Sequence, residues 1–403
     1  MPLYAGVCET DITPPIGVRL TEHGGERRST AVHDPLYARA LVLDNGLERL
    51  AIVVADLNCM PTPVADPIRA EIAAGIGTRR EAVLICCSGT LYGPDFGPVG
   101  CDAAYLDILK RKIVGITVQA AGALEAVYLT YGETSAQIGI SSPPGLSGAN
   151  ERAKANFAGP VAPIAQAICV NGADGKLLAL LFSHACAGSD VSEIGSSISA
   201  DWPGAACERL KARFRNEEAD GGVREGALPL FLAGCGADVR PIRQGSWELV
   251  RSSGVQIGDA AHAARWNAHG RQDESLMAGE TVVQLSGAIV GVGASLAISW
   301  MHLGGIRLLA FPAEMSVKFQ IDISARCSLP VICVSHANGY AGRGLAASDC
   351  PSPAPKDAAT DGFQAELVTN AMDEEAIRLA AYRILGIGSE EIAPFPPTPG
   401  CGR

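Results

Sequence analysis

The sequence has few aromatic residues, few charged residues and no long basic run. Aromatic side chains make up 5% of the 403 residues and charged side chains 19%, whereas apolar side chains make up 48%. The formal net charge is −11. A chain with so few stacking and basic side chains is poorly suited to bind nucleic acid or an anionic membrane. Its apolar content can fill a large core, which excludes a disordered chain.

Signals for export or membrane insertion are also missing. The N-terminus lacks a basic segment followed by an apolar one, so no secretory signal is visible. The uncharged stretch from Thr281 to Ile306 contains Gln284 and His302 and alternates like strands, so we expect no membrane span. The 13 cysteines include no CxxC pair, and their odd number favours reduced thiols. We expect a cytoplasmic protein with a small-molecule substrate, with homo-oligomerisation left open.

Strand-like and helix-like patterns alternate along the chain. Short β-rich runs occur at Ala38–Leu43, Arg49–Asp56, Ala82–Cys87, Ile164–Val170, Leu177–Ser183, Leu228–Leu232, Ala297–Leu303, Ile306–Phe311 and Val331–His336. Helical patterns occur at Ala104–Leu124, Pro203–Arg215, Ala313–Ser324 and Glu366–Ile384. The mixture predicts one layered α/β domain over residues 1–403, with a mixed β-sheet flanked by helices.

Glycine and polar residues predict the connections. Gly304 and Gly305 predict a tight hairpin between two strands, because glycine supplies the positive φ that such turns need. Polar or glycine-rich composition predicts long loops at 141–156 and 348–361 and a frayed tail at 394–403. Residues 244–275 are ambiguous, and an insertion over the site is one interpretation.

Common catalytic motifs are absent. The sequence contains no P-loop, no GxGxxG after a strand, no HExxH and no GxSxG. Polar residues instead follow several strands, where ligand sites form in open α/β sheets. These segments are Ser88–Pro94, His184–Asp190, Gly234–Arg243, Phe311–Glu314 and His336–Arg343. We expect the five strand ends to converge on one pocket.

Six segments follow one another in a recognisable order. They are Gly6–Pro15, His33–Leu43, Ile198–Gly204, Leu230–Val239, Phe311–Glu314 and Asn338–Tyr340. Their order resembles the neutral/alkaline (non-lysosomal) ceramidase family, specifically its N-terminal catalytic domain. The resemblance implies that domain's α/β fold and a zinc-dependent amidase that cleaves the N-acyl bond of ceramides. In the family, two His, a Glu and a Tyr hold the zinc, with a Ser and an Arg at the reaction centre.

Only part of the family's zinc site is present. Glu314 and Tyr340 stand at the family's zinc Glu and Tyr, and they are the candidate metal ligands. The first zinc His lies in a Thr-His-Thr-His-Ser-Gly-Pro segment, which matches Ser88-Gly89-Thr90-Leu91-Tyr92-Gly93-Pro94 without either His. The second lies in Cys-His-Pro, which matches Cys186-Ala187-Gly188, with His184 as a candidate substitute. A catalytic zinc usually needs about three protein ligands, so bound zinc is doubtful.

The reaction centre also differs from the family pattern. The family's Asn-Arg-Ser-Pro segment matches Ile140–Pro143, which lacks the Arg. Its Gly-Asp-Val-Ser-Pro segment matches Ala237–Pro241, in which Arg240 replaces the Ser. We assign candidate catalytic roles to His184, Asp238 and Arg240.

Arginines at the strand ends indicate the substrate class. Guanidinium groups bind carboxylate or phosphate in a bidentate manner, so Arg240, Arg243 and Arg343 favour a small anionic substrate. His33 and Cys235 complete the candidate substrate-binding residues. We predict a hydrolase that cleaves a C–N amide bond in a small, anionic substrate rather than in long-chain ceramide. The alternative is a non-catalytic ligand-binding paralogue that kept the scaffold and lost the zinc chemistry.

Several candidates also have a structural interpretation. Glu314 could cap the helix that follows it. Asp201 resembles an N-cap, with Pro203 near the first helical position. His33 with Asp34 could only fix a turn. Cys235 could be a nucleophile activated by His184 or His336, or a small packed side chain.

Overall fold

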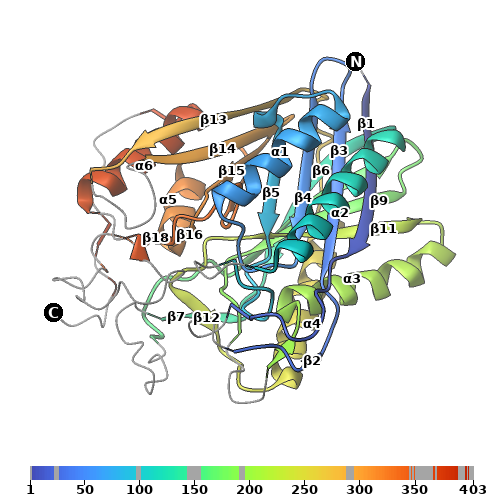
Figure 1. Ribbon diagram of the computed structural model, residues 1–403. Coiled ribbons are helices and arrows are strands. Elements are labelled where there is room, and N and C mark those ends of the chain that lie inside the picture. The colour runs from blue at the N-terminus through green and yellow to red at the C-terminus, as the bar shows by residue number, and fades with distance from the viewer. Residues whose placement is uncertain are drawn as a thin grey trace.

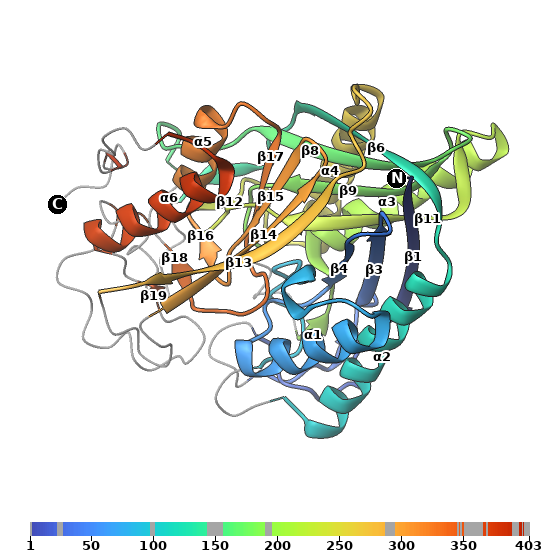
Figure 2. The same ribbon diagram turned by 90° about the horizontal axis from the view of Figure 1, so that it is seen from above.

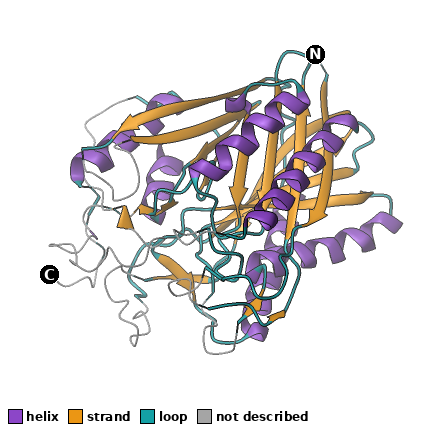
Figure 3. Ribbon diagram, viewed as in Figure 1, coloured by secondary structure: helices purple, strands orange, loops and turns teal. Residues whose placement is uncertain are grey.

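The computed structural model consists of two β-sheets packed face to face, with helices on both outer faces (Figures 1 and 3). It describes residues 2–21, 27–96, 101–142, 156–189, 196–286, 295–344, 346, 349, 366–367, 370–388, 395–396 and 398. Most of the predicted loops at 141–156 and 348–361, and most of the tail, lie outside these residues.

The larger sheet has eight strands in the order β11-β9-β8-β6-β1-β3-β4-β5. Their bounds are β1 Leu3–Asp11, β3 Tyr37–Asp44, β4 Arg49–Ala55, β5 Val83–Cys87, β6 Glu125–Ser135, β8 Ile164–Gly172, β9 Leu177–His184 and β11 Val223–Ala233. Strands β4 and β5 run parallel, as do β9 and β11, whereas the strands between them pair antiparallel. The sheet is therefore mixed, as the sequence predicts.

The second sheet has four strands in the order β13-β14-β15-β17. These are β13 Leu276–Gln284, β14 Ser295–Leu303, β15 Ile306–Ala310 and β17 Val331–Val334. The predicted hairpin joins β14 to β15, and Gly304 has φ +60. Short pairs complete the strands: β2 Ala31–Val32 with β10 Ser197–Ile198, β7 Gly139–Ser141 with β12 Val239–Pro241, and β16 Glu314–Met315 with β18 Arg343–Gly344 and β19 Glu366–Leu367.

The helices cover the two outer faces, as Figure 2 shows. On the larger sheet lie α1 Thr62–Ile76, α2 Ala103–Gly122, α3 Asp201–Ala219 and α4 Trp247–Trp266, and on the second sheet lie α5 Val317–Arg326 and α6 Ala371–Leu385. Strand β4 illustrates the layering, because Val53 packs toward α1 and α2 while Ile52 and Val54 pack toward the second sheet. Strands buried on both faces are apolar throughout, which explains why the sequence reveals them.

Two local predictions need correction. Asp201 is not an N-cap residue, because Ala200 occupies the cap position and Asp201 is the first residue of α3, with φ +58. Glu314 does not cap a helix either, since it lies in β16 and the Ser316 hydroxyl caps α5. In the described part of the chain, no helix is long and apolar enough to cross a membrane.

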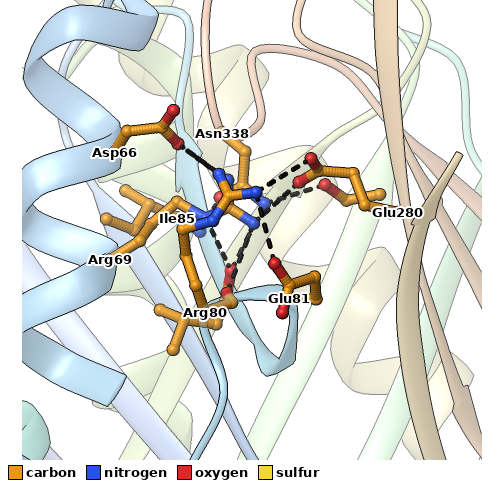
Figure 4. Close-up of polar contacts among 9 residues, drawn as sticks. Asp66, Arg69, Arg80, Glu81, Ile85, Glu280 and Asn338 are labelled. Carbon is orange, nitrogen blue, oxygen red and sulfur yellow. Dashed lines mark hydrogen bonds and ion pairs between the residues drawn. The ribbon is translucent and has the colours of Figure 1, made fainter. Parts of the chain in front are cut away.

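A cluster of ion pairs joins α1 to the second sheet at the edge of the larger one (Figure 4). The buried Arg69 of α1 donates to Asp66 Oδ1 at 2.9 Å and to Glu280 Oε2, in β13, at 3.0 Å. Arg80 donates to the same two carboxylates, at 2.9 Å and 3.2 Å. Because Arg69 Nε also binds the Val83 carbonyl oxygen at 3.1 Å, the cluster fixes the start of β5.

The edge strand β5 is covered by residues 336–338, which follow β17. The Ile85 amide donates to Asn338 Oδ1 at 2.8 Å, and the Asn338 amide donates to the Ile85 carbonyl at 2.8 Å. Asn338 Nδ2 donates to Val83 O at 3.3 Å and to Ser299 Oγ, in β14, at 2.9 Å. One side chain therefore satisfies an exposed sheet edge and ties it to the second sheet.

We predict that Asn338→Ala destabilises the protein by about 2–4 kcal/mol, because it leaves the Ile85 amide buried without its acceptor. Alanine is also less suited than asparagine to φ +57. Urea unfolding measures the loss. The control is Asn267→Ala at an exposed helix end, which should change stability by no more than about 0.5 kcal/mol. Equal stability of the two variants would refute the role of Asn338.

Candidate functional site

The segments that follow four strands, β5, β9, β11 and β17, meet at one end of the two sheets. The Ser335 amide donates to the Ala233 carbonyl at 2.8 Å, which joins the ends of β17 and β11. The Cys87 amide donates to the His336 carbonyl at 3.0 Å, which joins β5 to the same turn. The Gly234 amide donates to the His184 carbonyl at 3.1 Å, which adds β9. Polar side chains from distant parts of the sequence are thereby brought together.

Glu314 and Arg343 lie side by side on neighbouring strands. β16 and β18 are parallel, with Glu314 directly opposite Arg343. Arg343 Nε lies 3.5 Å from Glu314 Oε2, and another guanidinium nitrogen donates to the Ala237 carbonyl. The side chains of Glu314 and Arg343 are 16% and 17% exposed, so both remain accessible to a ligand.

His336 and Tyr340 adjoin this pair. His336 Nε2 lies 4.0 Å from Glu314 Oε1, and its ring stacks on Tyr340 with centroids 5.6 Å apart. Burial lowers the pKa of His336, against the opposing effect of the Glu314 charge. Burial also raises the pKa of Tyr340, and Glu314 raises it further, which keeps the phenol protonated. We call Glu314, His336, Tyr340 and Arg343 the Glu314 cluster.

Three charged groups influence the buried thiol of Cys186 electrostatically. Burial raises the pKa of the Cys186 thiol, Asp201 and Glu314 raise it further, and Arg240 lowers it. Asp201 accepts from the Ser189 amide at 2.7 Å, and its burial raises its pKa to about 6.

Two glycines separate His336 from Asp201. A Cβ atom at Gly188 would lie 3.1 Å from Asp201 Oδ2 and 3.0 Å from the Gly89 carbonyl oxygen. Gly89 has φ +82, and a Cβ atom there would lie 3.5 Å from His336 Nε2. Side chains at these positions would enter the space between the two groups.

Two other candidate residues, Asp238 and Cys235, make contacts with α5 and its start. Both Asp238 oxygens bind the start of α5, accepting from Ser316 Oγ at 2.6 Å and from the Val317 amide at 2.8 Å. Cys235 is fully buried in the core under α5, where its amide donates to Gln320 Oε1.

The two candidate histidines and Arg243 have different surroundings. His184 contacts the Ile164 carbonyl through Nδ1 at 2.9 Å and meets Trp202 edge-on. His33 stacks on Trp247, with centroids 4.4 Å apart, and its Nδ1 lies 2.6 Å from Asp34 Oδ2. Arg243 is exposed and donates to Ser252 Oγ.

The structure thus brings Glu314, Tyr340 and Arg343 together, and it adds His336 to them. The sequence predicts that His336 follows a strand but gives no sign that it is a site residue. The Asn-Gly pair that follows it is a turn signal, and this signal could have indicated that the imidazole faces the strand ends.

The side chains present do not fit the family's zinc site. Among the described residues, no group of three or more His, Cys, Asp and Glu is arranged to hold a metal ion. Arg343 presents a positive charge to Glu314, the candidate carboxylate ligand, and this charge would oppose a bound cation. Gly89 and Leu91 provide no donor where the family has its first zinc His.

We predict opposite pH effects from two buried groups. Burial lowers the pKa of His184 from 6.5 to about 4. The stability that the neutral imidazole contributes to the fold is therefore lost as pH falls below 6.5. Burial raises the pKa of Asp201 from 3.8 to about 6. The stability that the protonated carboxyl contributes to the fold is therefore lost as pH rises from 3.8 to 6. As pH falls from 6.5 to 4, protonation of His184 should lower the free energy of unfolding by ~3 kcal/mol, and His184→Gln should remove this decrease. Protonation of Asp201 should raise the free energy of unfolding by a similar amount over the same range, and Asp201→Asn should remove this increase.

The measurement is the free energy of unfolding in urea at several pH values. His184→Gln should flatten the acid decline relative to the wild type, and Asp201→Asn should steepen it. An exposed variant, His269→Gln, serves as the control for substitution itself. Curves for the two buried variants that run parallel to that of the wild type would contradict the assigned shifts.

Comparison with known proteins relates this fold to one group of solved structures. No family model matches the sequence, and no curated protein matches it. The neutral ceramidase from Pseudomonas aeruginosa superposes with a TM-score of 0.75 at 16% identity, over 98% of this chain and 77% of that one. A ceramidase described as complexed with C2 superposes with a TM-score of 0.73 at 15% identity, with the same coverage. The chain therefore has the fold of the neutral ceramidases, as its segments predict.

Proposed function

We propose that the protein is a hydrolase that cleaves a C–N amide bond in a small anionic substrate. The observation that carries the proposal is the Glu314 cluster, in which a carboxylate, an imidazole, a phenol and a guanidinium meet at the strand ends. Amide hydrolysis needs a positioned water, a hydrogen-bond donor for the developing oxyanion and a group that holds the substrate. The cluster contains a side chain suited to each task.

Each side chain has a specific part in the proposed reaction. The protonated Tyr340 phenol would donate to the amide carbonyl oxygen as negative charge develops there. Arg343 and Arg240 would hold the substrate's anionic group, because a planar guanidinium pairs with a carboxylate in a bidentate manner. Glu314 would orient the attacking water from its place between His336 and Arg343.

A ligand-binding protein without catalysis is the second candidate. It is favoured by the contact between Glu314 and Arg343, since a carboxylate neutralised by a guanidinium is a weaker base. The two candidates differ in turnover. Both bind an anionic ligand, but only the hydrolase releases an amine.

The arginine prediction uses 4-nitrosuccinanilic acid, an amide with a free carboxylate, and neutral 4-nitroacetanilide as its matched control. We expect Arg343→Ala and Arg240→Ala each to lower kcat/KM for the anionic amide by about 30- to 1000-fold, or 2–4 kcal/mol. Arg343→Lys and Arg240→Lys should each keep only part of the wild-type kcat/KM, because the bidentate contact is lost.

Arg243→Lys is the control variant, since this arginine is exposed and binds Ser252. Release of 4-nitroaniline reports the rate, and urea unfolding reports stability. If Arg343→Ala folds normally and keeps its preference for the anionic amide, Arg343 does not recognise substrate. If the variant is only unstable, its pair with Glu314 is structural. Ligand binding without release of amine by the wild type would favour the binding protein.

We also predict that long-chain ceramide is a poor substrate. Both zinc His, the Ser and the Arg of the family pattern are absent from the matching segments, and loss of one electrophilic group alone typically lowers the rate by about 10²- to 10³-fold. Turnover of a fluorescent ceramide is measured together with the zinc content of the purified protein. Ceramide turnover at ordinary enzyme rates with stoichiometric zinc would contradict both this prediction and the proposed site.

A further inference from the structure

We propose that His336 is the general base of this site and that Gly89 is required to leave room for its imidazole. The inference rests on the proposed function and names a catalytic residue for it. Gly89 and His336 are far apart in sequence but close together in space. Gly89 follows β5 and His336 follows β17, yet a Cβ atom at Gly89 would lie 3.5 Å from His336 Nε2.

The imidazole occupies the space into which a side chain at position 89 would extend. A Cβ atom at 3.5 Å is in ordinary van der Waals contact with the ring, and we expect a side chain as large as leucine to crowd the imidazole. Gly89 also has φ +82, which disfavours other residues there. The two positions are therefore expected to depend on each other.

The conformation of His336 indicates a function rather than a packing role. Its φ is +54, which is uncommon for a residue other than glycine, and such strain concentrates at functional sites. Hydrogen bonds on both sides hold it there, from its own amide to the Ala313 carbonyl at 3.1 Å and from the Cys87 amide to its carbonyl. Among the described residues, its buried Nδ1 has no hydrogen-bond partner, so the ring is not an anchor for neighbouring structure.

The distance between His336 and Glu314 fits one intervening atom. Nε2 and Oε1 are 4.0 Å apart, which is too long for a direct hydrogen bond. Two hydrogen bonds of ~2.8 Å that meet at a single water oxygen span about 4–5 Å. A water held between the two side chains would face the substrate-binding arginine, Arg343, at 3.5 Å from the same carboxylate.

The proposed step is balanced in atoms and charge. His336 Nε2 takes a proton from this water as the water oxygen bonds to the amide carbon, and the carbonyl electron pair moves to the oxygen beside Tyr340. The tetrahedral intermediate then collapses, the C–N bond breaks, and the proton passes from Nε2 to the leaving nitrogen. The products are an amine and a carboxylic acid, which loses its remaining proton to solvent and becomes a carboxylate. The Glu314 carboxylate stabilises the imidazolium that exists between the two steps.

The test combines kinetics with a double-mutant cycle. His336→Ala and His336→Asn should lower kcat for 4-nitrosuccinanilic acid by about 10²- to 10⁴-fold, with KM changed by less than about threefold. Asparagine tolerates positive φ, so it separates loss of the base from loss of folding. His302→Ala removes another imidazole, half-buried in β14, and should leave kcat unchanged.

The second arm measures whether positions 89 and 336 share space. Gly89→Leu should lower the urea midpoint of the wild type by more than it lowers that of His336→Ala, because the vacated ring leaves room for the leucine. The strain of a positive φ is the same in both backgrounds and cancels.

The possible outcomes separate the two proposals. Absence of hydrolysis by the wild type overturns the proposed function, and the base with it. Hydrolysis by the wild type that His336→Asn retains overturns only the base. If Gly89→Leu lowers the urea midpoint equally in the wild type and in His336→Ala, the two positions do not share space.

Discussion

The unpaired edge of β5 sets the arrangement of the candidate site. An edge strand leaves amide and carbonyl groups without partners, and here residues 336–338 satisfy them through hydrogen bonds to Val83, Ile85 and Cys87. These bonds hold His336 and Asn338 at positive φ. Tyr340 and Arg343 follow within a few residues, so covering one sheet edge places three site residues.

The other end of β5 is fixed by ion pairs. Arg69 and Arg80 join α1 to Glu280 of the second sheet, and Asn338 joins β5 to Ser299. The two sheets are thereby tied together near the start and along the length of β5. Fixed strand ends are a condition for positioning reacting groups, because small displacements of such groups reduce rates strongly.

Charge distinguishes this centre from a metal site. The Arg343 guanidinium lies beside the Glu314 carboxylate. The resemblance of the segments implies that Glu314 stands at a family zinc ligand and Arg240 at a family serine. Guanidinium groups on the protein bind an anionic ligand. A zinc ion would instead be bound by neutral imidazole and carboxylate side chains. The protein thus has the fold of the neutral ceramidases, and its candidate site carries a fixed positive charge beside Glu314.

Sequence reasoning revealed the strands that are buried on both faces, such as β4 and β9, because their apolar runs are continuous. It missed β1 and β13, whose partly exposed residues interrupt the pattern. It also left α4 ambiguous, since this helix packs on α3 through small residues such as Gly254 and Gly258.

For the site, the motifs identified Glu314 and Tyr340, and the strand-end rule identified the segments that contain Arg240 and Arg343. The position of His336 could not be predicted. It depends on hydrogen bonds to β5, about 250 residues earlier in the chain, which no local pattern encodes.

The most direct test of this account is a crystal structure of the protein with a bound, slowly hydrolysed anionic amide. The account predicts the ligand carboxylate at Arg343 and Arg240, and the amide carbonyl next to Tyr340 within reach of a water between His336 and Glu314. A ligand bound elsewhere, with the Glu314 cluster unchanged and unoccupied, would contradict it.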